Sequence, residues 1–252
     1  MGRLIAPRRV AYRHGASQRQ SYKLSPMTEQ GTAAFNRLAV IDIETTGLDV
    51  NSDLLLEVGI VIIDSQLHEI AHHCVLIASP ENVAWAKHTH AQWDRGAPLD
   101  PAQTMHLNNW LLSDLHQPWR FSQGHADGTH TTVVESRRGS DQLCAFLDEH
   151  GVVEPVPLVG SSVRALDGPF LALHMPKLFA RFTHRTIDAS ALTELARFID
   201  PGGYEELAAA TPGSDHRTVG DCRRSIEIIR AFALRYGIGS LTARAEPTAP
   251  TN

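Results

Sequence analysis

The sequence has few cysteines and no long apolar run, and each shortage argues against a class of protein. The three cysteines, Cys74, Cys144 and Cys222, are odd in number and never spaced as CxxC. This argues against a disulfide framework or a zinc ribbon and suits a reducing compartment. No apolar run approaches the roughly 18 residues that cross a bilayer, and the first residues lack the apolar core of a signal peptide. We therefore expect a cytoplasmic protein with no membrane partner.

Basic residues are scarce outside the N-terminal segment. The net charge is −5, but residues 1–30 contain six Arg or Lys side chains and one acid. That segment therefore carries +5, and the other 222 residues carry −10. An acidic body repels a polyanion, so any chemistry on nucleic acid would depend on local basic groups and on bound divalent cations.

Regular periodicity is also absent from both ends of the chain. Residues 1–35 are rich in Arg, Ser, Gln and Gly and predict a disordered basic tail. A targeting peptide, or a start at Met27, remains an alternative. Residues 239–252 include an Ala, Pro and Thr-rich stretch and predict a second disordered tail. One domain is therefore expected over residues 36–238.

Within this domain, apolar runs and helical periodicity predict an α/β fold. Residues 80–130 are difficult to assign, with helical fragments around 101–115. Three strands come first, and strands then alternate with helices, which predicts a mixed sheet of about five strands, three antiparallel and then parallel, flanked by helices. The expected strands are 38–44, 54–63, 72–77, 156–159 and 186–188, and the expected helices are 136–150, 166–173, 190–198 and 218–236.

Two acids in the first expected strand form the first candidate site. Asp42 and Glu44 lie two residues apart, so both side chains project from one face while Ile41 and Ile43 face the other. Adjacent carboxylates repel one another, and a hard divalent cation ligated by oxygen removes that repulsion. An edge strand with two solvated acids explains the pattern alone equally well. A central position for the strand would favour a metal site.

Three further residues follow in structural contexts that fit the same site. Asp167 begins a helix after a strand and a small-residue turn, where an ordinary helix N-cap is the simpler interpretation. His216 follows the polar turn 212–215, and Asp221 lies five residues later in the last helix. Taken singly, these would be read as a surface histidine and an exposed helical acid. Their order and contexts together indicate a catalytic metal site.

The ordered set of Asp42 with Glu44, then Asp167, then His216 with Asp221 resembles the three motifs of the DEDDh 3′-to-5′ exonucleases. Within that superfamily, the segments 42–48, 175–179 and 185–197 resemble oligoribonucleases. The resemblance implies a ribonuclease H-like fold, with an insertion at about 80–130 in the exonuclease domain. It also implies a 3′-to-5′ exoribonuclease that degrades short oligoribonucleotides to nucleoside 5′-monophosphates.

The resemblance also implies a two-metal mechanism with Mg²⁺ or Mn²⁺. Asp42, Glu44 and Asp221 would hold one ion, while Asp42 and Asp167 would hold the second. His216 would act as the general base, since the ordinary pKa of histidine, about 6.5, suits catalysis near neutral pH.

The resemblance also implies contacts with the substrate, but this sequence matches only part of the family's set. Leu48 matches a leucine that separates two bases, although core packing is an equal alternative. Arg185 offers a planar fork suited to a 5′ phosphate. A stacking tyrosine, supplied by the second subunit of a homodimer in the family, is replaced here by His184. The full expected set is Thr45, Leu48, His106, Ser161, Ser162, His184, Arg185 and Ser190.

These departures leave other activities open. Either Trp93 or Trp110 could replace the family's stacking tryptophan, or none does. The main alternative is a proofreading or processing exonuclease on single-stranded DNA or longer RNA, which an Arg-rich tail would assist. An inactive module that binds nucleic acid is a further alternative. The histidines at 72–73 and 88–90 lack partners at zinc-site spacing and are expected to be solvated.

Overall fold

The three apolar runs at the start of the domain form an antiparallel meander. In a computed structural model of the chain, which describes residues 36–125 and 127–238, these are β1 (Arg37–Thr45), β2 (Leu55–Asp64) and β3 (Glu69–Ile77). Nine consecutive residues of β2 are buried, as expected for a strand covered on both faces. In the β1–β2 register, Asp42 is opposite Gly59 and Glu44 is opposite Glu57.

Parallel strands extend the sheet from both edges of this meander. β5 (Val156–Gly160) lies beside β1, and β6 (Phe182–Asp188) lies beside β5. A sixth strand, β4 (His130–Val133), pairs with β3 and was not expected, because its four residues are too short and polar to show a strand pattern. The order β4-β3-β2-β1-β5-β6 places β1 inside the sheet. The edge-strand interpretation of Asp42 and Glu44 is therefore wrong.

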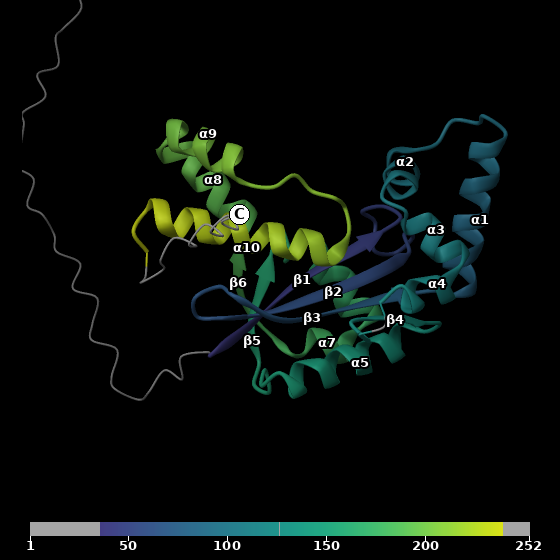
Figure 1. Ribbon diagram of the computed structural model, residues 1–252, viewed down its shortest axis with the longest axis horizontal. Coiled ribbons are helices and arrows are strands. Elements are labelled where there is room, and N and C mark those ends of the chain that lie inside the picture. The colour runs from purple at the N-terminus through teal and green to yellow at the C-terminus, as the bar shows by residue number, and fades with distance from the viewer. Residues whose placement is uncertain (1–35, 126, 239–252) are drawn as a thin grey trace, which may run out of the picture. The chain divides into compact units, whose positions relative to one another are not determined.

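Helices cover both faces of the sheet (Figure 1). α10 (Thr218–Arg235) crosses one face over β1 and β2. α5 (Ser136–Glu149), α6 (Asp167–His174) and α7 (Pro176–Phe179) pack with the other face. α8 (Ala189–Ile199) and α9 (Pro201–Ala210) pack on each other and on α10 around Ala196, Leu207 and Phe232. The last helix therefore packs both on the central strands and on the α8–α9 pair.

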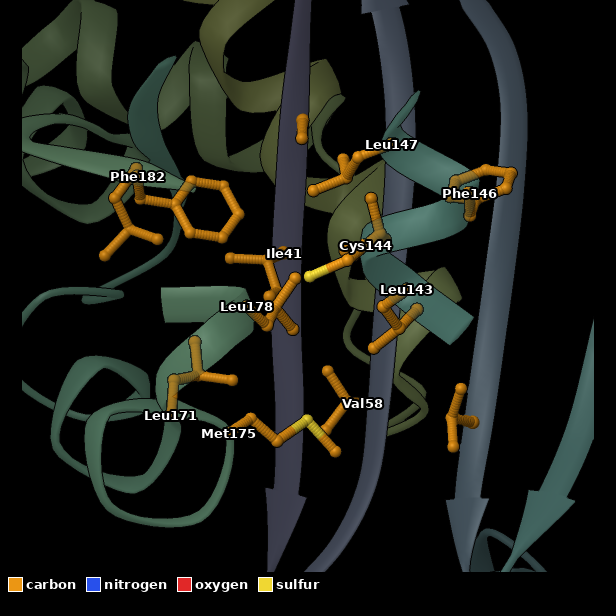
Figure 2. Packing of buried hydrophobic residues seen from close by; sticks show 14 of the residues in the cluster. Ile41, Val58, Leu143, Cys144, Phe146, Leu147, Leu171, Met175, Leu178 and Phe182 are labelled. Carbon is orange, nitrogen blue, oxygen red and sulfur yellow. The ribbon is translucent and has the colours of Figure 1, made fainter. Parts of the chain in front are cut away.

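Ile41 anchors the core on the face of β1 opposite the acids. Figure 2 shows Ile41 beside Cys144 and Leu178, with Leu143 and Leu147 projecting from α5 toward the strands. Ile41, Leu143, Leu147 and Leu178 are all fully buried. This packing holds Ile41 inward, so the alternation of the strand directs Asp42 to the other face.

The segment 80–130 is helical and packs onto the domain. It contains α1 (Pro80–Asp94), α2 (Pro101–Asn108), α3 (Leu111–His116) and α4 (Pro118–Gln123). The helical fragments expected around 101–115 are α2 and α3. α2 begins with a capping box between Asp100 and Gln103 and with Pro101 in its first turn. The helix α1 was not expected, because its apolar periodicity is weak. Its N-cap residue, Ser79, is nevertheless a clear signal for the start of a helix.

Both expected tails, 1–35 and 239–252, lie outside the described residues. Across residues 36–125 and 127–238, no helix has the length and apolar character needed to cross a membrane.

Candidate active site

Three carboxylates from two distant parts of the chain converge at the end of β1. One oxygen from each of Asp42, Glu44 and Asp221 lies within 4.8 Å of the others. Asp42 and Glu44 share a face of β1, as their spacing predicts, and Asp221 projects from the first turn of α10. Among the described residues this is the one set of three such ligand groups at that spacing.

Asp167 is a fourth acid that lines the same pocket as these three. It is the first residue of α6 and only 4% exposed. The amide nitrogen of Ile43 donates to Asp167 Oδ1 at 3.1 Å, so the carboxylate is turned toward the backbone between the two acids of β1. Leu166, not Asp167, is the N-cap of α6, and the simple N-cap interpretation of Asp167 is therefore wrong.

His216 lies beside these acids, in the loop that precedes α10. It lines the same pocket as Asp42 and Asp221. Its backbone nitrogen donates to Ser214 Oγ at 3.1 Å, and this hydroxyl donates to Asp221 Oδ2 at 2.8 Å. Ser214 therefore connects the backbone of the histidine to the carboxylate of the third acid.

The electrostatics of the cluster favour protonation in the absence of a cation. Burial, together with repulsion from neighbouring acids, raises the pKa of Asp42 well above its usual value and raises that of Glu44 to about 9. Burial raises the pKa of Asp167 to about 7, and the pKa of Asp221 is raised for the same reason. Carboxylates with such values gain strongly from a bound cation.

A buried oxygen in the cluster supports the same conclusion. Asp221 Oδ1 is buried and has no hydrogen-bond partner. Leaving a carboxylate oxygen buried and unpaired is costly. Oxygen-only donors at this spacing suit Mg²⁺ and similar hard divalent cations, whereas zinc sites typically include nitrogen or sulfur. The site is therefore a carboxylate cluster suited to a divalent metal.

Glu57 is a fifth acid near the cluster but is neutralised by its own partner. Arg217 Nη2 donates to Glu57 Oε2 at 2.7 Å. Burial raises the pKa of Glu57, but the charge and donors of Arg217 and two hydrogen bonds from Thr218 outweigh it and hold the pKa below its usual value. Glu57 therefore stays ionised beside Glu44, while Arg217 offsets its charge.

The pocket over the acids has a volume of about 700 Å³. Of the expected substrate contacts, Thr45, Leu48 and Ser161 line it. Leu48 is 79% exposed, which excludes its alternative role in core packing. Asp53 holds the loop that presents Leu48, because its carboxylate accepts from Thr46 Oγ1 at 3.1 Å and from the Asp49 nitrogen at 2.9 Å.

Of four other expected contacts, Ser162 and Ser190 follow the carboxyl ends of β5 and β6, and His184 and Arg185 lie within β6. Ser162 Oγ donates to Ser190 Oγ at 3.1 Å, and the backbone nitrogens of both serines donate to Asp188 Oδ1 at 2.9 Å. His184 and Arg185 are exposed on β6. None of these four is among the residues that line the acidic pocket. The carboxyl end of β1 points to this same edge of the sheet, since β1, β5 and β6 are mutually parallel.

His106, an expected substrate contact, is buried and is not among the residues that line the pocket. The residue is fully buried, its Nε2 is 2.8 Å from the carbonyl oxygen of Thr45, and its Nδ1 is 3.9 Å from Glu44 Oε2. Its ring therefore supports the carboxyl end of β1 through the Thr45 carbonyl, and the structure does not favour a direct contact with substrate. Trp93 and Trp110 are exposed, and neither lines the pocket.

Several residues of the site gave little or no signal in the sequence. α2 contributes Pro101, Ala102 and Met105 to the pocket wall, although the segment was expected only as helical fragments. Glu57 is the one acid inside the apolar run 54–63. A single charge in a buried strand usually has a specific partner, and that signal could have identified it.

Comparisons with known proteins agree with this geometry. No family model matches the sequence. A protein named oligoribonuclease from Streptomyces avermitilis is 31% identical over 216 residues, which cover 83% of this chain and 94% of the relative. Oligoribonucleases of Aromatoleum aromaticum and Corynebacterium diphtheriae are each 28% identical, over 78% and 86% of this chain and over 92% and 91% of their own length.

A solved structure of exonuclease I shares the fold, with a TM-score of 0.51 and 11% sequence identity. The match covers 79% of this chain and 41% of that chain, so the present chain spans less than half of that enzyme. At this identity, the likeness concerns the fold alone. Because the identity to the Streptomyces relative extends over most of both chains, the protein belongs to the oligoribonuclease family of DEDDh 3′-to-5′ exonucleases.

Proposed function

We propose that the protein is a metal-dependent exoribonuclease that removes nucleoside 5′-monophosphates from the 3′ end of short oligoribonucleotides. The observation that carries the proposal is the convergence of Asp42, Glu44 and Asp221 beside His216 in one pocket. Phosphodiester hydrolysis needs a metal site and a proton acceptor next to each other, and this pocket offers both. The family membership supplies the direction of degradation and the class of substrate.

The proposed roles follow from where each side chain lies. Asp42, Glu44 and Asp221 would hold one Mg²⁺ or Mn²⁺ ion, and Asp42 with Asp167 would hold a second. Bound ions supply positive charge for the phosphate and lower the pKa of water. His216, exposed at the rim, takes the proton of the attacking water on its ring.

Contacts with the nucleotides are part of the same proposal. Thr45 and Leu48 form one wall of the pocket, and Leu48 lies against the base of the terminal nucleotide. Ser162 and Ser190, after the ends of β5 and β6, bind the 5′ phosphate of a short substrate together with Arg185 from within β6. Such a contact would favour dinucleotides, since a longer chain carries no terminal phosphate at that distance from its 3′ end.

The proposal is tested by comparing labelled substrates of different length and sugar. A 5′-labelled RNA dinucleotide, an RNA 20-mer and a DNA 20-mer are incubated with Mn²⁺ or with EDTA. We expect release of mononucleotide from the dinucleotide with Mn²⁺, none with EDTA, and loss of activity in Asp42→Asn and His216→Ala. Asp94→Asn, an exposed acid of α1, is the matched control. Full activity in Asp42→Asn would refute the mechanism, and a clear preference for either 20-mer would refute the substrate class.

A homodimer in the cytoplasm completes the proposal. All three cysteines are free and buried, which fits a reducing compartment. His184 is exposed on β6, where it could stack on a base held by a second subunit. Light scattering on the full chain measures the mass in solution, and a monomer at every active concentration would exclude the dimer.

A further inference from the structure

The backbone of His216 has an unusual conformation that needs support from its surroundings. Its φ is +53°, in the left-handed region that few residues other than glycine adopt, although histidine does so more often than most. Such a conformation persists where neighbouring contacts fix it, and it is common at functional sites. The imidazole itself is exposed, and no hydrogen bond to its ring is found within residues 36–125 and 127–238.

The first support is the ion pair behind the loop. Glu57, only 1% exposed, receives the guanidinium of Arg217 in a forked contact, with Nη2 to Oε2 at 2.7 Å and Nε to Oε1 at 3.4 Å. The third nitrogen of Arg217 donates to Asp114 Oδ2 at 2.9 Å. A planar fork held on two sides leaves the guanidinium little freedom. The backbone that follows His216 is thereby anchored to β2 and α3.

The same carboxylate also caps the helix that carries Asp221. The N-cap residue of α10 is Arg217, and its side chain makes no capping hydrogen bond. Instead, the Thr218 backbone nitrogen donates to Glu57 Oε1 at 3.1 Å, and Thr218 Oγ1 donates to it at 2.8 Å. A carboxylate at a helix N-terminus satisfies an unpaired N–H group and is favoured by the helix dipole. Glu57 therefore fixes where α10 begins.

The second support comes from Asn109, in the turn between α2 and α3. Its side-chain Nδ2 donates to the carbonyl oxygen of His216. Its Oδ1 accepts from the Leu111 nitrogen at 3.0 Å, and its own carbonyl accepts from Arg217 Nη1 at 3.3 Å. Asn109 is thus fixed at both ends, so its amide can hold the peptide that follows His216 in a set orientation.

We propose that Asn109 and the Glu57–Arg217 pair are positioning residues that hold His216 in its catalytic orientation. The inference rests on the proposed function, because it assigns these residues a part in proton transfer through His216. Neither Asn109 nor Arg217 lines the acidic pocket, so both act through the histidine and not on the substrate. Displacing a general base by about 1 Å is enough to lower turnover strongly.

Asn109→Asp tests the proposal with the least disturbance to the fold. The aspartate keeps the oxygen that accepts from Leu111 but has no amide to donate to His216. We expect kcat on an RNA dinucleotide to fall by about tenfold or more, with KM and the Mn²⁺ concentration for half activity within about twofold. In the His216→Ala background, Asn109→Asp should cause no further fall, because residues that act as a unit are not additive. Glu57→Gln carries the same expectation for the ion pair.

Asn108→Ala is the matched control, since Asn108 is the exposed neighbour at the end of α2, and its kcat should equal that of the wild type. An unchanged kcat in Asn109→Asp would overturn the proposal. So would an equal fall in the presence and absence of His216, or a change confined to KM.

A measurement without turnover separates this inference from the proposed function. Hydrogen exchange of the amides at 214–217 should become at least about tenfold faster in Asn109→Asp and stay unchanged in Asn108→Ala. If the wild-type chain cleaves no oligonucleotide, the proposed function fails, and exchange alone then decides whether Asn109 holds the loop. Unaltered exchange at 214–217 in Asn109→Asp would overturn the positioning role.

Discussion

Binding of a divalent cation to the acid cluster should release protons, because burial and mutual repulsion raise the pKa values of Asp42 and Glu44 in the folded chain. The pKa of Glu44 is raised to about 9, and that of Asp42 is raised well above its usual value. With a pKa of about 9, Glu44 is protonated at pH 7 without metal, whereas a metal ligand must be ionised. We expect saturating Mn²⁺ to release at least about one proton per chain at pH 7, from Glu44, and the raised pKa values of Asp42 and Asp167 add to this number.

The same shift determines how the stability of the metal-free chain depends on pH. An unfolded chain loses the proton of Glu44 near pH 4.5, but the folded chain keeps it to about pH 9. Because the folded state binds more protons between these values, the free energy of unfolding falls as the pH rises through this window. One proton corresponds to about 1.4 kcal/mol per pH unit, so Glu44 alone should lower the stability by about 3 kcal/mol between pH 6 and pH 8.

Two measurements check this reasoning. Calorimetric titration with Mn²⁺ in buffers of different ionisation enthalpy counts the protons released. Urea unfolding in EDTA at pH 6, 7 and 8 gives the slope of stability with pH. Glu44→Gln should release about one proton fewer and should flatten the slope by about 1.4 kcal/mol per pH unit, whereas Asp94→Asn should match the wild type. Binding heats that do not depend on the buffer, with a stability that stays level or rises from pH 6 to 8, would show that the acids are already ionised.

Five further variants separate folding from substrate binding. A methyl group at Gly59 would meet a threonine side chain of α10 at 2.4 Å, so Gly59→Ala should lower the free energy of unfolding by about 1–3 kcal/mol. Gly202→Ala, with open space around it, should stabilise α9 by about 0.5–1 kcal/mol, and urea unfolding of both variants checks the pair. Leu48→Ala should lower kcat/KM for a dinucleotide by about tenfold or more. Its melting temperature should be unchanged, because Leu48 is exposed. An unaltered kcat/KM would show that Leu48 does not contact the substrate. Asp188→Ala should lose a helix N-cap, about 1 kcal/mol, and raise KM by separating the two serines that it holds. Asp200→Ala, which removes the N-cap of α9, should lower stability by a similar amount without changing KM. If Asp188→Ala and Asp200→Ala have the same KM, the proposed phosphate contact is contradicted.

The central strand and the order of most elements could be predicted from the sequence because their signals are local. The alternation of Ile41, Asp42, Ile43 and Glu44 determines which side chains share a face. The apolar run of β2 predicts burial on both faces, as the structure has it. By contrast, β4 has four residues with no strand periodicity, and it becomes a strand only because the edge of β3 offers hydrogen-bond partners.

What only the tertiary structure decided is which polar groups meet across long separations in the chain. Glu57 and Arg217 are 160 residues apart, and Asn109 and His216 are 107 apart. No local pattern encodes such contacts, because they depend on how α10 and α3 pack against the sheet. His106 is a further example. Its motif suggested a substrate contact, but packing against the end of β1 buries the side chain completely. The residue types and spacing thus determined the chemistry of the site, and long-range packing determined which residues hold that chemistry in place.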